Sequence, residues 1–148
     1  MDMQTVAKEA TENILSMLGI SAVYIDTIEQ SALSSANDVN VIIGFTEGIR
    51  GNAMLGMDRE IAMRLASIMM GGMEVSELDE LTISAIAELG NMIVGNTFTN
   101  LASETSINFS PPTVVVGDGL KIMISRVSTQ KLHYEVDGKS IYLLLCVE

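Results

Sequence analysis

The longest regular pattern in the chain is ELDELTISAIAELGNMIVGNTFTNLAS, residues 77–103. Apolar residues recur in it at intervals of three and four, as they do along a helix that packs against a core. Ser76 and Asp79 stand at the spacing of a capping box, so the sequence predicts that the helix begins there. This is the longest predicted element, and the segments on both sides of it decide the fold class.

Short apolar stretches separated by turn residues flank this helix and are typical of strands. Two further helices are predicted, one that ends at Gly19 and one that Asp58 caps and that runs through Met70. The order of helix, strands, two helices and strands indicates an α+β fold, an antiparallel sheet with helices packed on one face. We expect residues 1–148 to form one such domain. The predicted strands cover residues 22–33, 39–45, 50–57, 113–116, 120–136 and 140–147.

Composition and charge exclude several classes of function. Hydrophobic residues make up 48% of the chain and aromatic residues only 4%, so we expect a globular protein with an aliphatic core. The net charge of −11 repels nucleic acid phosphates and anionic lipid headgroups, so we expect neither as a partner.

The single cysteine, Cys146, excludes a disulfide framework within the chain and a multi-thiolate metal site. No apolar run approaches about 18 residues, and no signal segment is predicted at the start of the chain. The expected location is therefore the cytoplasm.

A narrow polar stripe runs along the predicted long helix. At about 100° per residue, Ser84, Glu88, Asn91 and Gly95 fall within a sector of roughly 60°. A primary amide can hydrogen-bond a water molecule and orient it, and a glutamate one turn away can bind a lysine. The pair suits the positioning of reactants better than nucleophilic attack.

Two glycines in the same helix each cost about 1 kcal/mol of stability relative to alanine. Gly95 lies on the polar stripe near Asn91, where it would let a partner approach closely. Gly90 lies on the opposite side, where it would let the sheet approach. A second explanation stays open, in which both glycines simply allow tight packing within the protein.

The motif Ser84-x3-Glu88-x2-Asn91, followed by the pair Pro111-Pro112, resembles the signature of the CheC, CheX and FliY family of chemotaxis phosphatases. The string ELGNMIVGN at residues 88–96 and the order of elements are similar to the same family. CheC-like members carry two such helices, whereas this chain has one Glu-x-x-Asn. The chain therefore resembles the CheX type most.

The resemblance implies a mechanism and a partner. Asn91 would enter the active site of a phosphorylated CheY-like receiver domain and orient a water molecule toward the aspartyl phosphate, while Glu88 would pair with a receiver lysine. Ser84 and Gly95 would lie at the contact with the partner. Mg²⁺ would be bound by the receiver, so this chain would need no metal or cofactor of its own.

The resemblance also implies a homodimer that forms through the sheets. The segment 141–147 carries few charges and would offer an edge for such pairing. One alternative function stays open, a non-catalytic interaction module of the same fold that binds a regulator or acts as a flagellar-switch-like domain.

No second site emerges from the remaining residues of the sequence. His133 is the single histidine and has no carboxylate or thiol pattern around it, which favours a structural or surface role. Ser34 and Ser35 lack the setting of a nucleophile elbow. The glycines at 71–72 and 117–119 match no phosphate-binding loop.

Overall fold

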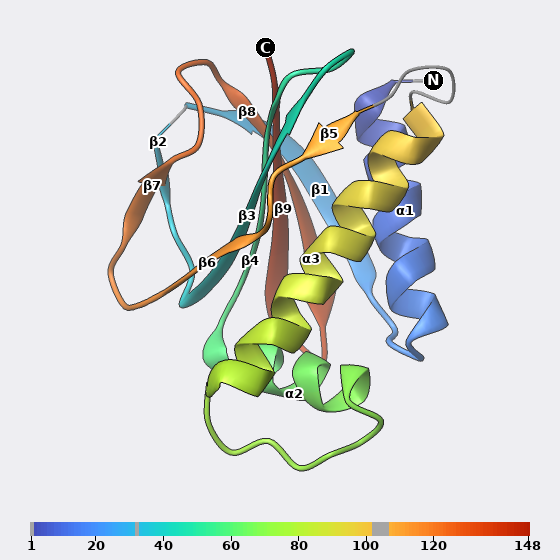
Figure 1. Ribbon diagram of the computed structural model, residues 1–148, viewed down its shortest axis with the longest axis vertical. Coiled ribbons are helices and arrows are strands. Elements are labelled where there is room, and N and C mark those ends of the chain that lie inside the picture. Colours follow the sequence, from blue (N-terminus) through green and yellow to red (C-terminus); the bar gives the residue numbers. More distant parts are fainter. Residues whose placement is uncertain (1, 32, 102–106) are drawn as a thin grey trace.

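The computed structural model describes residues 2–31, 33–101 and 107–148. Its helices are α1 (Met3–Met17), α2 (Arg59–Met69) and α3 (Glu80–Leu101). Figure 1 shows α1 and α3 in front of the sheet and α2 across its lower end. The strands are β1 (Val23–Gln30), β2 (Leu33–Ser35), β3 (Val39–Thr46), β4 (Gly51–Met57), β5 (Asn108–Phe109), β6 (Thr113–Val116), β7 (Lys121–Met123), β8 (Thr129–Val136) and β9 (Lys139–Val147).

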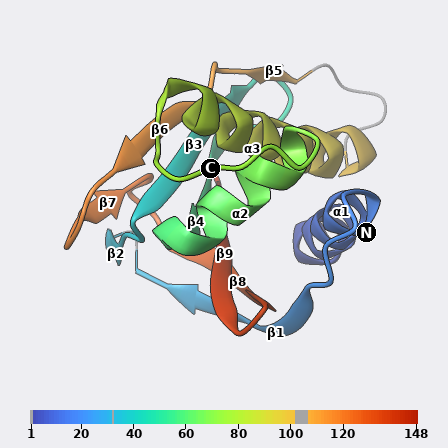
Figure 2. The ribbon, with the colours of Figure 1, turned by 90° about the horizontal axis from the view of Figure 1, so that it is seen from below.

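The main sheet is antiparallel and has seven strands in the order β1-β8-β9-β4-β3-β5, with β6 also paired to β3. A separate two-stranded sheet joins β2 to β7. Figure 2 shows β1 at one margin of the molecule and the helices on the inner side of the curved sheet. The predicted class, an antiparallel sheet with helices on one face, is confirmed.

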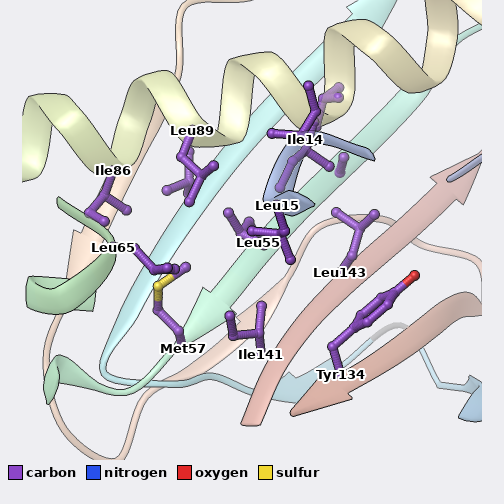
Figure 3. Close-up of a cluster of buried hydrophobic side chains, with 14 of the residues drawn as sticks. Ile14, Leu15, Leu55, Met57, Leu65, Ile86, Leu89, Tyr134, Ile141 and Leu143 are labelled. Atoms are coloured by element: carbon purple, nitrogen blue, oxygen red, sulfur yellow. The ribbon is translucent and has the colours of Figure 1, made fainter. Parts of the chain in front are cut away.

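The core lies between the sheet and the helices. Alternate residues of β9, namely Ile141, Leu143 and Leu145, are buried on the helix side, as the two-residue period of a strand requires. Ile86 and Leu89 of α3 point into the same core (Figure 3). A smaller cluster of Met54, Ile124 and Leu144 lies on the other face of the sheet.

Helix α1 is fixed at its start and along its length. Asp2 caps it, because its Oδ1 accepts the Thr5 N–H at 2.8 Å. The buried Tyr134 of β8 donates its hydroxyl to the Lys8 carbonyl at 3.2 Å, which ties the helix to the sheet. Burial raises the pKa of the Tyr134 phenol well above its ordinary value, so this donor keeps its proton. No helix in the described ranges is long and apolar enough to cross a membrane.

Three predicted elements differ from the structure in their bounds. The predicted strand 22–33 extends too far, because β1 ends at Gln30 and Leu33 belongs to β2 in the other sheet. The long helix begins at Glu80, because Asp79 is itself the cap and its Oδ1 accepts the Thr82 N–H at 2.9 Å. The capping box of Ser76 and Asp79 is therefore wrong. The predicted helix end at residue 103 lies outside the described residues. The predicted strand 120–136 divides into β7 and β8, which belong to different sheets, since a turn at Ser125 and Val127 (N–H to Oγ, 3.1 Å) redirects the chain.

The predicted edge at residues 141–147 is also wrong. β9 lies inside the sheet, paired with β8 on one side and β4 on the other. Its uninterrupted apolar run is explained by burial on both faces, with Leu143 and Leu144 both about 1–2% exposed. The margin of the sheet far from α3 is formed by β1.

Candidate functional site

The inner face of α3 is anchored against the sheet. Ile86, Leu89 and Ile93 are fully buried in the core. A Cβ atom placed on Gly90 would lie 2.8 Å from Cγ1 of Val41, so this position has no room for a side chain. The sheet thereby fixes which face of α3 points outward.

The outward face carries the predicted stripe, which we call the α3 ridge: Ser84, Glu88, Asn91 and Gly95. Ser84 and Glu88 are exposed, and Asn91 and Gly95 are partly exposed. Within the described part of the chain, the side chains of Ser84, Glu88 and Asn91 have no hydrogen-bond or ion-pair partner. The structure thus brings all four residues together on one accessible surface.

The two glycines of α3 have different surroundings. Gly90 meets Val41 of the sheet, whereas a Cβ on Gly95 would have no heavy atom within 4 Å. Internal packing therefore explains Gly90 but not Gly95. Gly95 has no side chain, so the helix backbone at this position of the α3 ridge is open to an approaching molecule.

Both ends of the helix are held in place. At the N-terminal end, the hydrogen bond from the Thr82 N–H lowers the pKa of the Asp79 carboxyl, so the cap is ionised at neutral pH. At the other end, the buried Phe98 ring lies 4.2 Å from the ring of Phe45 and 6.3 Å from that of Phe109, measured between centroids. The α3 ridge is thus a rigid platform.

The diproline of the motif lies between β5 and β6, the two strands that continue the sheet beyond β3. Just before it, the Ser110 N–H donates to the Gly44 carbonyl and the Ser110 Oγ accepts the Gly44 N–H, both at 2.8 Å. Figure 1 shows β6 beside α3. The segment therefore borders the helix that carries the ridge.

The electrostatic surroundings of the α3 ridge are acidic. The sequence contains no lysine or arginine between Arg64 and Lys121, and the carboxylates of Glu77, Asp79 and Glu80 are exposed before and at the start of α3. Ion pairs of this chain lie elsewhere, as in Arg59 with Asp118. Among the described residues Glu88 makes no ion pair, so its carboxylate is open to a positively charged group of another molecule.

The other candidates from the sequence have structural roles. The His133 ring stacks on Tyr142 with centroids 4.6 Å apart, and its Nε2 lies 2.9 Å from the Ser140 Oγ. Cys146 is buried. Among the described residues, no group of three or more His, Cys, Asp or Glu side chains is placed to hold a metal ion.

Four cavities formed by described residues have no residue of the α3 ridge in their linings. A cavity of about 380 Å³ opens at the ends of β3, β4 and β5, beside Arg50 and Phe109. Its lining includes no residue of the ridge.

The chain is similar to known proteins over most of its length. Residues 39–136 match the family model of chemotaxis phosphatase CheX. The chain is 39% identical over 112 residues to the CheY-P phosphatase CheX of Thermotoga maritima, which covers 75% of this chain and 72% of that protein.

Solved structures show the same fold. A chemotaxis protein CheX from Desulfovibrio desulfuricans matches with a TM-score of 0.87 and 20% identity, over all of both chains. The match to the CheX–CheY–BeF3–Mg²⁺ complex from Borrelia burgdorferi has a TM-score of 0.78 and 25% identity, over 99% of this chain and 98% of the other.

Proposed function

This chain belongs to the CheX family of chemotaxis phosphatases, and we propose that it hydrolyses the aspartyl phosphate of a CheY-like response regulator. The relative from Thermotoga maritima is named a CheY-P phosphatase, and the one from Borrelia burgdorferi is a complex with CheY, BeF3 and Mg²⁺. The single observation that carries the proposal is the α3 ridge, with Glu88 and Asn91 facing outward and without partners in the described chain.

Asn91 acts as the residue that positions water. Its amide oxygen accepts a hydrogen bond from a water molecule and its N–H₂ group donates to a neighbouring oxygen, which directs the water oxygen at phosphorus. The bond from water to phosphorus forms as the bond from phosphorus to the aspartyl oxygen breaks. The aspartate leaves as a carboxylate, the phosphate takes up the hydroxyl of the water, and the remaining proton of the water passes to the phosphate or to solvent.

Glu88 holds the two proteins in register. It lies one turn from Asn91 on the same face, and no basic residue lies between Arg64 and Lys121 in the sequence to compete for it. An ion pair with a receiver lysine would fix the depth of Asn91 in the receiver pocket. Ser84 and Gly95 flank the pair and would contact the partner at either end.

The receiver supplies the metal in this proposal. Mg²⁺ would neutralise charge on the transferring phosphoryl group from within the receiver. This chain, over its described residues, has no group of acidic, histidine or cysteine side chains fit to hold such an ion. The family and the single cysteine support a cytoplasmic location.

The proposal is tested by the lifetime of the phosphate on a phosphorylated receiver domain with Mg²⁺. We expect the rate of phosphate loss to rise in proportion to the amount of this protein that is added, so that the lifetime becomes shorter. A receiver that binds this protein but keeps its phosphate for an unchanged time would contradict the proposal and favour a non-catalytic interaction module.

We also propose that the protein forms a homodimer, through β1 and not β9. β1 is an outer strand of the main sheet, and its Val23, Ile25 and Ile28 are 59%, 43% and 49% exposed. An outer strand that shows three large apolar side chains favours pairing with a second chain.

If the dimer forms through β1, a charged side chain on this strand should prevent its formation. We expect Ile28→Lys to shift the sedimentation coefficient from that of a dimer to that of a monomer at micromolar concentration. Met73→Lys is the matched control, because Met73 is 54% exposed and lies between α2 and α3, outside the main sheet. A wild-type protein that sediments as a monomer would contradict the proposal.

A further inference from the structure

The first turn of α3 carries a large apolar side chain on its surface. Leu81 is 57% exposed, while Thr82 beside it is 2% exposed and Leu78 packs against the core. The Asp79 cap holds this turn. Leu81 therefore points outward from a fixed backbone, which lowers the entropic cost of burying it against a partner.

Leu81 is in line with the α3 ridge. Seven residues at about 100° each place it roughly 20° from Glu88 around the helix axis. The rise of about 1.5 Å per residue places it about 10 Å from Glu88 and about 15 Å from Asn91 along the axis. A lone exposed leucine needs no explanation, so its alignment with the ridge is the informative observation.

One partner surface can cover both Asn91 and Leu81. A specific interface buries about 800 Å² on each side, which corresponds to a patch of roughly 16 Å radius. A receiver domain of about 120 residues has a radius of gyration of about 13 Å, so it spans this distance. A receiver centred on Asn91, near the middle of α3, thus reaches the first turn of the helix.

The acidic residues around Leu81 indicate the charge of the partner surface that would contact it. Glu77, Asp79 and Glu80 are exposed next to Leu81 in the sequence, with no basic residue among them. Acidic side chains around an apolar one match a hollow that has basic residues at its rim. The receiver would then have an acidic active site opposite Asn91 and a basic surface about 15 Å away, opposite Leu81.

We propose that Leu81 is a docking residue that inserts into an apolar hollow with a basic rim on the receiver, and that it sets affinity and the choice of receiver. This inference rests on the proposed phosphatase function and deepens it. Leu81 is too far from Asn91 to touch the phosphate, so it contributes to binding and not to the chemical step.

Steady-state kinetics with a phosphorylated receiver tests this. We expect Leu81→Ala to raise KM roughly five- to twentyfold with kcat unchanged. The apolar contact that is lost stabilises the ground-state complex and the transition state equally. Leu81→Glu should raise KM further, since it places a carboxylate in the hollow. Both residues suit the first turn of a helix, so the fold should be kept.

The controls separate this inference from the proposed function. Met17→Ala removes an exposed apolar side chain from α1 and should leave KM unchanged. If Asn91→Ala stops turnover while both Leu81 variants keep the wild-type KM, the docking role is overturned and the phosphatase stands. If Asn91→Ala leaves turnover unchanged, the proposed mechanism itself fails. A KM that rises in both Leu81 variants but not in Met17→Ala supports the docking role.

Discussion

Replacing Asn91 with alanine is expected to lower the rate of phosphate release from a phosphorylated receiver by roughly a hundredfold or more. Asn91 carries the only primary amide on the α3 ridge; its oxygen can accept a hydrogen bond from a water molecule while its N–H₂ group donates to a neighbouring oxygen. Alanine removes the groups that orient the water but leaves the rest of the ridge in place. The measurement is single-turnover phosphate release at saturating phosphatase, which reports the chemical step.

Two further variants make the result specific. Asn91→Asp keeps the shape but adds a negative charge facing the phosphate, so we expect a loss close to that of alanine. Glu88→Gln keeps Asn91 but loses the ion pair with the receiver, so KM should rise roughly tenfold while kcat falls less. Glu88 is exposed and Asn91 partly so, and thermal unfolding should confirm that all three variants fold. A rate for Asn91→Ala equal to wild type would refute the role of the amide.

The sequence alone predicted the α3 ridge well because the signal is local. Helical spacing needs only the rotation per residue, so the grouping of Ser84, Glu88, Asn91 and Gly95 follows once the helix is recognised. The side on which the helix meets the sheet was indicated by apolar residues such as Ile86 and Leu89. The sequence leaves open whether internal packing explains both glycines, since only the structure shows Val41 against Gly90 and open space at Gly95.

The order of the strands could not be predicted in the same way. The low charge of residues 141–147 predicts an edge strand, yet that pattern equally suits β9, a strand buried on both faces. The pairing that decides between the two joins β9 to β4, far apart in the sequence. Long-range pairings of this kind leave no periodic trace in either strand.

The start of the long helix could not be predicted from the sequence for a different reason. Asp79 stands both three residues after Ser76 and three residues before Thr82, so the sequence offers two caps that compete. The structure selects the second, in which Thr82 is buried. That choice also fixes Leu81 on the outer face of the first turn, a position that the sequence did not assign to the site.

The two glycines of α3 are expected to respond in opposite ways to substitution. Gly90→Ala should destabilise the fold by about 1–2 kcal/mol, because its methyl group would overlap Val41 Cγ1 at 2.8 Å and this cost exceeds the gain in helix propensity. Gly95→Ala should stabilise the fold by up to about 1 kcal/mol, because the space around it is open. Denaturant unfolding of both variants measures the difference.

A larger residue at Gly95 tests directly whether the receiver docks against this turn of α3. A Cβ atom at Gly95 would have no heavy atom within 4 Å, so the leucine of Gly95→Leu extends from an open position and the fold should keep its stability. If the receiver approaches the helix backbone here, the new side chain holds the two proteins apart and draws Asn91 out of the receiver pocket. We expect kcat/KM to fall roughly ten- to hundredfold, since overpacking a close contact costs about 1–3 kcal/mol.

The control for this variant is Asn13→Leu, which adds a leucine to the exposed face of α1 and should leave kcat/KM unchanged. Stability and activity then move independently: Gly90→Ala loses stability while it keeps its activity per folded molecule, and Gly95→Leu loses activity while it keeps its stability. Full activity of Gly95→Leu would mean that the receiver does not approach α3 at this turn. The open space beside Asn91 would then need another explanation, because Gly95 costs helix stability and no internal contact compensates for it.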